Sequence, residues 1–301
     1  MFDDDDLWLP ILGMLVVCWV TVYYGMALKQ TKSTQRRLEP ATEFFKQLSK
    51  FQSKGHDKRL FAMLHSSVLM IVERGAVRAM SRCVAEVYGP LISIDASTAQ
   101  FKGDEKSVSV VARATFANLP TTPVVVDASW IVGRSNGWSV ISFNVEPPPN
   151  REIDVLSYAD PEEFADFGEK FVTSLLSVSP LYARGVMVDA LKGKYPSEAE
   201  LANEVGKVMS ASGGLKQRNR IDITLTSAKK RTAVNENGQT FVSGIHIEFH
   251  ILGAKRDMEA SVTMCFSRLQ CFVQRYALKA LGPNERQAIY DQTTGETIPL
   301  F

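Results

Sequence analysis

Two histidines and one glutamate alternate with apolar residues in the segment Ile245-His246-Ile247-Glu248-Phe249-His250-Ile251. Imidazole and carboxylate groups are common zinc ligands, so this is the most metal-like cluster in the chain. In a strand the three polar side chains share one face, with neighbours about 7 Å apart and His246 and His250 about 13 Å apart. Bonds of about 2 Å cannot join the two imidazoles to one zinc ion. The pattern therefore predicts a solvated outer strand face and no metal site.

Acid–base catalysis would need carboxylates or histidines that converge inside a pocket. Three carboxylates in predicted strands are candidates for an inward position: Asp95, Asp127 and Glu259. The strand pattern leaves open which face is concave. The sequence pattern assigns no catalytic role to His56 or His65, and the chain carries no recognisable catalytic or cofactor motif. The sequence therefore predicts a non-enzymatic protein without a cofactor or metal, and an enzyme or small-ligand binder is the alternative.

Composition places the chain among globular proteins. Its 301 residues are 45% hydrophobic and 22% charged, which is enough for about two ordinary domains. The net charge of +1 lacks the basic excess of a protein that binds nucleic acid. Cys18 lies in an apolar stretch, and Cys83, Cys265 and Cys271 have no CxxC spacing. We therefore expect free thiols and no nucleic-acid partner.

The stretch from Leu7 to Leu28 contains no Asp, Glu, Lys, Arg or His. As a helix it would rise about 33 Å, enough to cross a hydrocarbon core of about 30 Å. Aromatic residues that favour membrane interfaces stand near its ends: Trp8, Trp19, Tyr23 and Tyr24. A cleaved signal peptide is the competing interpretation, but the acidic start at residues 3–6 argues against it. A buried core helix is the second alternative. We expect a single membrane-spanning helix.

The charges beside this stretch predict its orientation. No Lys or Arg precedes it, whereas Lys29, Lys32, Arg36 and Arg37 follow it. The positive-inside rule therefore places the N-terminus outside and the rest of the chain in the cytoplasm, and the opposite orientation is the alternative. These four residues, and two further basic clusters at residues 216–220 and in an expected hairpin tip at 229–231, are candidates for contact with anionic lipid headgroups.

Residue periodicity predicts the same order of elements twice. We expect residues 1–39 to form the tail, the span and a basic linker, residues 40–150 a first α+β domain, residues 151–282 a second, and residues 283–301 an irregular tail. In the first domain, spacings of three and four predict helices and a later period of two predicts strands. The expected helices are Ala41–Phe51, Asp57–Glu73 and Ala76–Tyr88, and the strands are Leu91–Phe101, Lys106–Ala117, Pro123–Gly133 and Trp138–Glu146.

The second domain repeats this order. Its first helix begins at Asp160 with an apolar stripe of Phe164, Phe167, Phe171 and Leu175. The remaining elements are helices Leu181–Lys192 and Ser197–Ser210 and strands Arg220–Ser227, Gln239–Leu252, Asp257–Ser267 and Leu269–Lys279. The third strands also share an echo, Asp127-Ala128-Ser129-Trp130 and Glu259-Ala260-Ser261-Val262, which favours a tandem duplication. The predicted fold class is α+β, with helices packed on an antiparallel sheet in each unit.

The first unit resembles the NTF2-like superfamily of cone-shaped α+β domains. The resemblance rests on the stretch from His56 to Gly89-Pro90-Leu91-Ile92-Ser93-Ile94 and on Gly137-Trp138-Ser139-Val140-Ile141-Ser142-Phe143-Asn144-Val145. Coa1/Tim21-type domains are similar in outline, and a single span followed by two such domains also resembles VirB8-like components of secretion and conjugation machines. Members of this superfamily range from enzymes to scaffolds, so the resemblance implies a fold and no particular activity. The VirB8-like proteins place their domains outside the cytoplasm, unlike the orientation that the basic flank predicts here.

The sequence therefore predicts a single-span membrane protein that acts as a scaffold or assembly subunit of a larger membrane complex. Membrane lipid and other subunits of that complex are the expected partners, together with further copies of the chain. A small-ligand binder with a cone-shaped pocket and a component of a secretion or conjugation machine are the alternatives.

Overall fold

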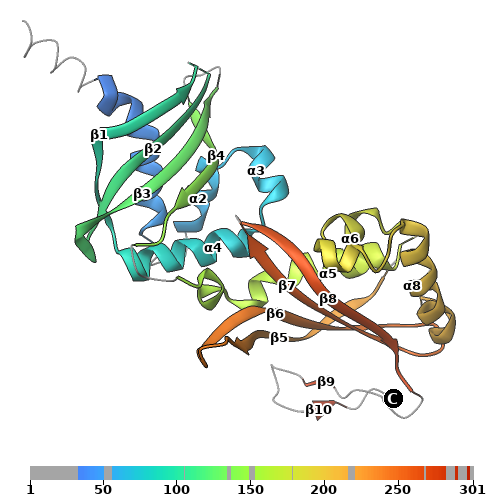
Figure 1. The fold of residues 1–301 in the computed structure, drawn as a ribbon. Helices are drawn as coiled ribbons and strands as arrows, with labels where there is room; N and C mark the ends of the chain where they lie inside the picture. The colour runs from blue at the N-terminus through green and yellow to red at the C-terminus, as the bar shows by residue number, and fades with distance from the viewer. Residues whose placement is uncertain are drawn as a thin grey trace, which may run out of the picture. The chain divides into compact units, whose positions relative to one another are not determined.

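The computed structural model describes residues 33–50, 56–104, 106–133, 137–148, 153–177, 179–215, 221–267, 269–282, 289–290 and 297–298. The predicted span from Leu7 to Leu28, with Lys29 and Lys32, lies outside these ranges. Within them, no helix combines the length and the apolar character needed to cross a membrane. The described chain is α+β and contains two four-stranded antiparallel sheets with helices (Figure 1).

The chain divides into two compact units that are each discontinuous in sequence. Unit 1 contains Met1–His65 and Val84–Glu152, and unit 2 contains Ser66–Cys83 and Ile153–Phe301. The expected division near residue 150 therefore misses residues 66–83, which contact the second sheet's unit. Hydrophobic periodicity assigns these residues to helices but carries no information about which sheet the helices pack on.

In unit 1 a helix occupies residues 33–48, so the predicted linker at 29–39 is wrong from residue 33 onward. The reason is a continuous apolar stripe at helical spacing, formed by Leu38, Ala41, Phe44, Phe45 and Leu48, all of them buried. Pro40 lies inside this helix, where it removes one backbone hydrogen bond. Burial of the stripe, which includes a Phe44–Phe143 ring contact at 4.7 Å, offsets that loss.

The predicted helix at 57–73 is interrupted. The structure has α2 (His56–Met63) and α3 (Ser66–Ile71), with Leu64 between them in a parallel bridge to Val140. The His65 backbone N–H also donates to the Val140 carbonyl at 2.9 Å. Pairing with the edge of the sheet therefore stops the helix, because those backbone groups cannot serve both structures.

The remaining elements of unit 1 agree closely with the sequence prediction. The helix α4 (Arg74–Cys83) of unit 2 runs directly into η2 (Val84–Tyr88), a short π-helix of unit 1, and Gly89 with a φ of +74° ends it. The sheet is a meander in the order β1-β2-β3-β4, and Figure 1 shows the 33–48 helix, in blue, against one of its faces. The strands are β1 (Leu91–Gly103), β2 (Ser107–Phe116), β3 (Leu119–Val132) and β4 (Trp138–Val145).

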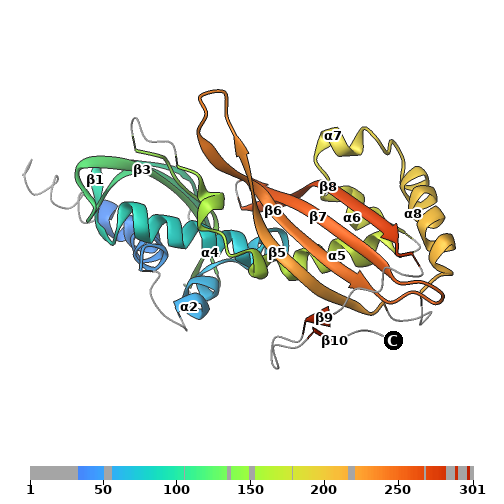
Figure 2. The same ribbon diagram turned by 90° about the horizontal axis from the view of Figure 1, so that it is seen from below.

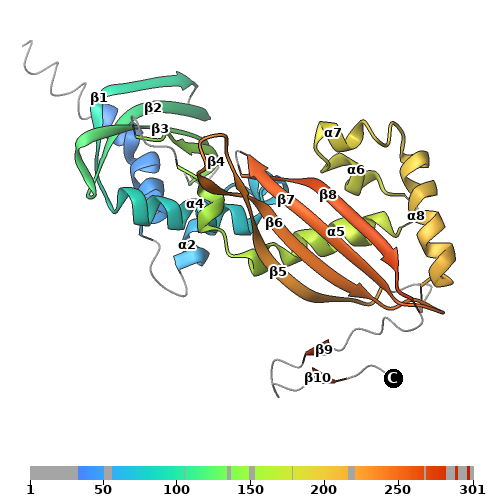
Figure 3. The same ribbon diagram turned by 60° about the horizontal axis from the view of Figure 1, so that its bottom comes forward.

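Unit 2 begins with short helices that pack on a second meander, β5-β6-β7-β8. Asp154 and Asp160 cap η3 (Val155–Tyr158) and η4 (Pro161–Phe164), and the predicted apolar stripe is buried along η4 and α5 (Ala165–Leu175). The other helices are α6 (Leu181–Gly185), α7 (Asp189–Lys192) and α8 (Glu198–Ser212), the last with Ser197 as its cap. Figure 3 shows α5 on one face of the sheet and α8 beside β8.

The second sheet contains β5 (Ile223–Val234), β6 (Thr240–Ile251), β7 (Met258–Ser267) and β8 (Gln270–Ala280). The β6–β7 pairing covers only Ile245–Ile251, so the tip of the β5–β6 hairpin projects beyond the sheet (Figure 2). The predicted hairpin tip at 229–231 is wrong, because Lys229, Lys230 and Arg231 lie within β5 and the turn is at 235–239. Hydrogen bonds to the Asn235 side chain extend the strands to that turn.

The two units repeat one pattern in detail. Met187 forms a parallel bridge to Val273 of β8, as Leu64 does to Val140 of β4. Val140 pairs with Trp130 of the third strand in unit 1, and Val273 pairs with Met264 of the third strand in unit 2. In both units the register of the third strand shifts at this pair. The structural equivalent of Trp130 is therefore Met264, so the four-residue echo seen in the sequence is displaced by two residues. The repeated topology favours the predicted duplication.

Candidate ligand-binding cleft in unit 1

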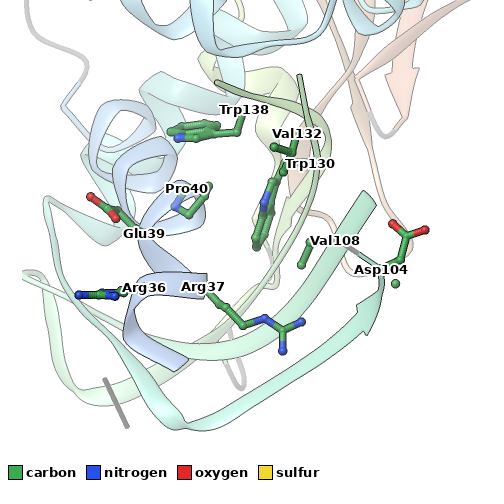
Figure 4. Close-up of a pocket in the computed structure, with 10 residues that line it drawn as sticks. Arg36, Arg37, Glu39, Pro40, Asp104, Val108, Trp130, Val132 and Trp138 are labelled. Carbon is green, nitrogen blue, oxygen red and sulfur yellow. The ribbon is translucent and has the colours of Figure 1, made fainter. Parts of the chain in front are cut away.

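A cleft of about 690 Å³ lies in unit 1 between the first turns of the 33–48 helix and one end of the sheet. The helix contributes two arginines, a glutamate and a proline, and the strand ends contribute tryptophans, valines and a tight turn. The lining residues are Arg36, Arg37, Glu39, Pro40, Gly103, Asp104, Val108, Trp130, Val132 and Trp138 (Figure 4). A volume in this range is typical of small-molecule sites.

The apolar wall of the cleft comes from strand residues that share one face of the sheet. Val132 pairs with Trp138, and Trp130 pairs with Val140 across the β3–β4 hairpin. Trp130 is only 3% exposed and lies deepest, while Trp138 is partly exposed. Two indole rings and two valines therefore offer a ligand apolar and aromatic contact area.

Arg37 supplies a positive charge next to this wall. Its guanidinium carbon lies 4.3 Å from the centre of the Phe101 ring, a cation–π contact that holds the side chain in place. In Figure 4 Arg37 extends toward the strand ends that carry Val108 and Asp104, whereas Arg36 and Glu39 point to the other side of the helix. Within the described residues, no carboxylate forms an ion pair with Arg36 or Arg37.

Asp104 is engaged in the β1–β2 turn. Its carboxylate accepts hydrogen bonds from the backbone N–H groups of Lys106 and Ser107, both at 2.8 Å. These bonds, that of Ser107 first, lower the pKa of Asp104. The carboxylate therefore stays ionised and caps the turn, and among the described residues it forms no ion pair with Arg36 or Arg37.

A second hollow, of about 710 Å³, borders the same helix. It shares Arg36, Glu39 and Trp138 with the cleft and adds polar helix residues and Ile94 of β1. The first half of the 33–48 helix is therefore bordered by open space at two places.

The equivalent end of unit 2 is filled. Phe266 stands two residues beyond Met264, as Val132 stands two beyond Trp130, and its ring stacks on Phe164 at 5.8 Å. Gly75 of α4 packs so closely on Phe164 that a Cβ there would lie 2.8 Å from the ring. Aromatic side chains and a glycine contact therefore occupy the place where unit 1 has its cleft.

The histidine strand is partly as predicted. Ile245, Ile247 and Phe249 are buried on one face, and His246 and Glu248 are partly exposed on the other. The prediction that His250 is solvated is wrong, because this residue is 3% exposed and its Nε2 lies 3.2 Å from the Asp257 carboxylate. Asp257 folds back from the β6–β7 turn to cover it, which strand alternation cannot show. Among the described residues, no cluster of three or more metal-binding side chains occurs.

The three candidate inward carboxylates do not enter a pocket. Asp95 is exposed and accepts a hydrogen bond from the Ser97 hydroxyl at 2.7 Å. Asp127 and Glu259 alternate with buried neighbours and lie on the opposite face of their strands, where Glu259 pairs with Lys279 at 3.2 Å. Of the four predicted headgroup contacts, Arg36 and Arg37 lie at the cleft, and Lys29 and Lys32 lie outside the described residues.

Unit 2 has a surface groove of about 710 Å³ between α5 and α6, lined mainly by polar residues and by Tyr182. Burial, and then the nearby Glu73 carboxylate, raises the pKa of Tyr182 to about 12. Burial also raises the pKa of Glu73 itself. Tyr182, which lines the groove, is 42% exposed, and the adjacent Leu181 is 63% exposed, so exposed apolar surface lies beside the groove.

Sequence reasoning noted Trp138 and the arginines but did not place them together. Trp130 lies in the strand before the predicted turn Ser135-Asn136-Gly137 and Trp138 follows that turn, and this hairpin spacing is the signal that could have placed both indoles on one face. The position of Arg37 beside them depends on the helix that the sequence analysis took for a linker.

A scan against protein-family models finds no match for the chain, and a search of curated proteins finds no similar sequence.

Proposed function

We propose that the chain is a non-catalytic binding protein in which unit 1 holds a small ligand with an apolar body. The cleft of about 690 Å³ with Trp130 and Trp138 in its wall carries this proposal. Ligand pockets are typically concave and apolar with a few placed polar groups, and this cleft combines apolar walls with Arg37. Unit 2, whose equivalent end is filled, would serve as a structural partner module.

Tryptophan fluorescence tests this function directly. Four tryptophans occur in the chain, and a Trp8→Phe/Trp19→Phe variant leaves only the two in the cleft as indole reporters. We expect a neutral brominated apolar compound, such as methyl 9,10-dibromostearate, to quench their emission with saturation. A larger side chain at Val108 should fill the cleft, and phenylalanine is chosen because it adds no further indole emission. We expect Val108→Phe to remove saturable quenching.

The matched control is Val234→Phe at the exposed end of β5, which should leave quenching unchanged. Quenching that rises linearly without saturation in the parent, or that survives Val108→Phe, would contradict the proposal. Circular dichroism of each variant separates a filled cleft from an unfolded unit.

The second candidate function is the scaffold or assembly subunit of a membrane complex that the sequence predicts. The specific observation in its favour is the exposed apolar surface of Leu181 and Tyr182 beside the α5–α6 groove, because exposed apolar patches mark interaction sites. Purification in mild detergent, followed by mass spectrometry of copurifying subunits, tests it. A defined complex that is lost in Leu181→Glu, and kept in Leu225→Glu on β5, supports the scaffold, and recovery of a monomer alone contradicts it.

We also propose that Leu7–Leu28 anchors the chain in a membrane, with the units on the cytoplasmic side. The support is the uncharged stretch with Lys29, Lys32, Arg36 and Arg37 after it. A cysteine placed at Asn237 in the β5–β6 turn should resist an impermeant thiol reagent in intact cells and react after permeabilisation. Labelling in intact cells would contradict this orientation and indicate the opposite one.

The helix-then-meander order and the helix against the curved first sheet support the proposed likeness to NTF2-like domains. The alternative of a VirB8-like component of a secretion or conjugation machine rests on the predicted span followed by two such units.

A further inference from the structure

We infer that the ligand of the unit 1 cleft is an anionic amphiphile, an acyl chain that ends in a carboxylate or is carried by an anionic phospholipid. The inference rests on the proposed binding function and adds the ligand's charge and chemical class. It follows from three observations: an arginine held beside an apolar wall, acidic neighbours that form no ion pair with it among the described residues, and the place of these residues in the sequence.

The first observation is the position of Arg37. Its guanidinium is held over the Phe101 ring at 4.3 Å, and no described carboxylate pairs with it. A guanidinium presents several N–H donors in a planar fork that matches the oxygens of a carboxylate or phosphate. Because Phe101 already restrains the side chain, binding an anion costs little further conformational entropy. Arg36, one residue earlier and on the other side of the helix, adds positive charge at longer range.

The second observation concerns the acidic groups that could cancel this charge. Asp104 is the carboxylate on the same side as Arg37 in Figure 4, and its Oδ1 accepts both turn hydrogen bonds. Glu39 points to the other side of the helix with Arg36. Neither carboxylate forms an ion pair with Arg37 among the described residues, so its guanidinium donors are available to an anion.

The apolar wall continues inward from Arg37. Val108 and Trp130 are largely buried, and Trp138 and Val132 remain partly open to a ligand. Each methylene group removed from water contributes about 0.8 kcal/mol, so an acyl chain along these residues would supply much of the affinity. A purely polar anion such as inorganic phosphate could not use this wall, which is why we assign an amphiphile.

The third observation is the distance along the chain from the uncharged stretch. Arg37 follows Leu28 by nine residues, which is about 14 Å in a helical path. If Leu7–Leu28 lies in a bilayer, Arg37 can reach lipid headgroups, so a membrane phospholipid can be the source of the amphiphile. A free long-chain acid offers the same chemistry, and the experiment separates the two sources.

The test uses the full-length Trp8→Phe/Trp19→Phe chain reconstituted with uncharged phosphatidylcholine. We titrate 9,10-dibromostearate and, separately, its methyl ester, which has the same chain without the charge. We expect the acid to quench Trp130 and Trp138 with an apparent Kd about tenfold lower than the ester, a ratio equal to about 1.4 kcal/mol. Arg37→Gln should reduce this ratio to near one, and Arg231→Gln, an exposed arginine in β5, should leave it unchanged.

Equal quenching by acid and ester, or a ratio that survives Arg37→Gln, would overturn the anionic ligand and leave the proposed binding function in place. Saturable quenching by neither compound would overturn both. In a second arm, phosphatidylglycerol with brominated chains replaces one third of the lipid. Quenching there, and not with brominated phosphatidylcholine, identifies the phospholipid as the source; quenching by the free acid alone identifies a soluble ligand.

Discussion

Unit 1 and unit 2 contain the same order of elements, yet one keeps an open end beside its first helix and the other fills it. Pairing at the bridges Leu64–Val140 and Met187–Val273 aligns the two sheets residue by residue. On the second strand of each sheet, every buried residue of unit 1 in this alignment corresponds to a larger residue in unit 2. The aligned sets are Val108, Val110, Ala112 and Ala114 in unit 1 and Ile245, Ile247, Phe249 and Ile251 in unit 2.

This difference shows how one fold can serve two purposes. In unit 1 the open cleft is lined at one end of the sheet by Val108, Val132, Trp130 and Trp138. In unit 2 the larger side chains need space next to α5. Gly168 of α5 provides this space, because it faces the Phe249 ring and has no side chain. A packed interior contributes stability, whereas an open cleft gives up part of that stability for a binding surface.

The largest expected effect comes from emptying the filled unit. Phe249→Ala removes a ring that is fully buried, so we expect the free energy of unfolding of unit 2 to fall by about 3–5 kcal/mol. Phe249 aligns with Ala112, which is already alanine, so the comparison in unit 1 is Val108→Ala on the same strand, which removes much less buried surface and should cost about 1–2 kcal/mol. Denaturant titration followed by amide exchange in each sheet measures both. Similar losses at the two sites would contradict the contrast between a filled and an open unit.

The close packing at Gly168 can be tested by adding a methyl group there. A Cβ there would lie 2.9 Å from the Phe249 ring, so we expect Gly168→Ala to destabilise unit 2 by about 1–3 kcal/mol despite the better helix propensity of alanine. Gly206 in α8 has open space around its Cβ position, and Gly206→Ala should stabilise the helix by about 0.5–1 kcal/mol. Adding Phe249→Leu to Gly168→Ala should recover part of the loss. Equal effects of the two glycine changes would show that the Phe249 ring does not limit the space.

A third test concerns the helix that joins unit 2 from the middle of the chain. Glu163 accepts hydrogen bonds from both terminal nitrogens of Arg82 and lies 3.5 Å from Arg78, and all three side chains are partly buried. We expect Glu163→Gln to cost about 1–3 kcal/mol and to raise amide exchange in α4. The matched control is Glu204→Gln, which breaks an exposed pair with Lys207 and should cost less than about 0.5 kcal/mol. Unchanged exchange in α4 would count against this pair as the contact that ties residues 66–83 to unit 2.

These contacts also explain which parts of the fold the sequence predicts. The strands are correct to within a few residues in most cases, because alternating β-branched residues record the sheet directly. The helices at 57–73 and 181–192 are wrong at Leu64 and Met187, where the local pattern stays helical but the backbone pairs with a distant strand edge. The membership of α4 depends on Glu163 and Phe164, about 80 residues away, and no local pattern contains that information.

The candidate site is harder to predict for the same reason. The sequence places Arg36 and Arg37 after an apolar stretch, and this suggests lipid contact but no cleft. Pro40 indicates the start of a helix, and only burial of Leu38 with the rest of the stripe extends the helix back to the arginines. The cleft is bounded by Val108 and Val132, and nothing in their local pattern shows that Val132 stands where unit 2 has the larger Phe266.

The smallest expected effect concerns Glu73, at the start of α4 in unit 2. Burial raises its pKa above 4.5, and Lys170 offsets this only in part. The folded state therefore binds more protons than the unfolded state between pH 4.5 and the raised pKa, so this group makes stability fall as the pH rises through that window. We expect Glu73→Gln to match the parent at pH 4 and to exceed it by about 0.5 kcal/mol or less at pH 7. Glu169→Gln, an exposed change on α5, controls for the loss of one negative charge. A parent that is more stable than Glu73→Gln at pH 7 would mean that attraction to Lys170 outweighs the desolvation of Glu73, and that unit 2 gains stability from charge as well as from its filled interior.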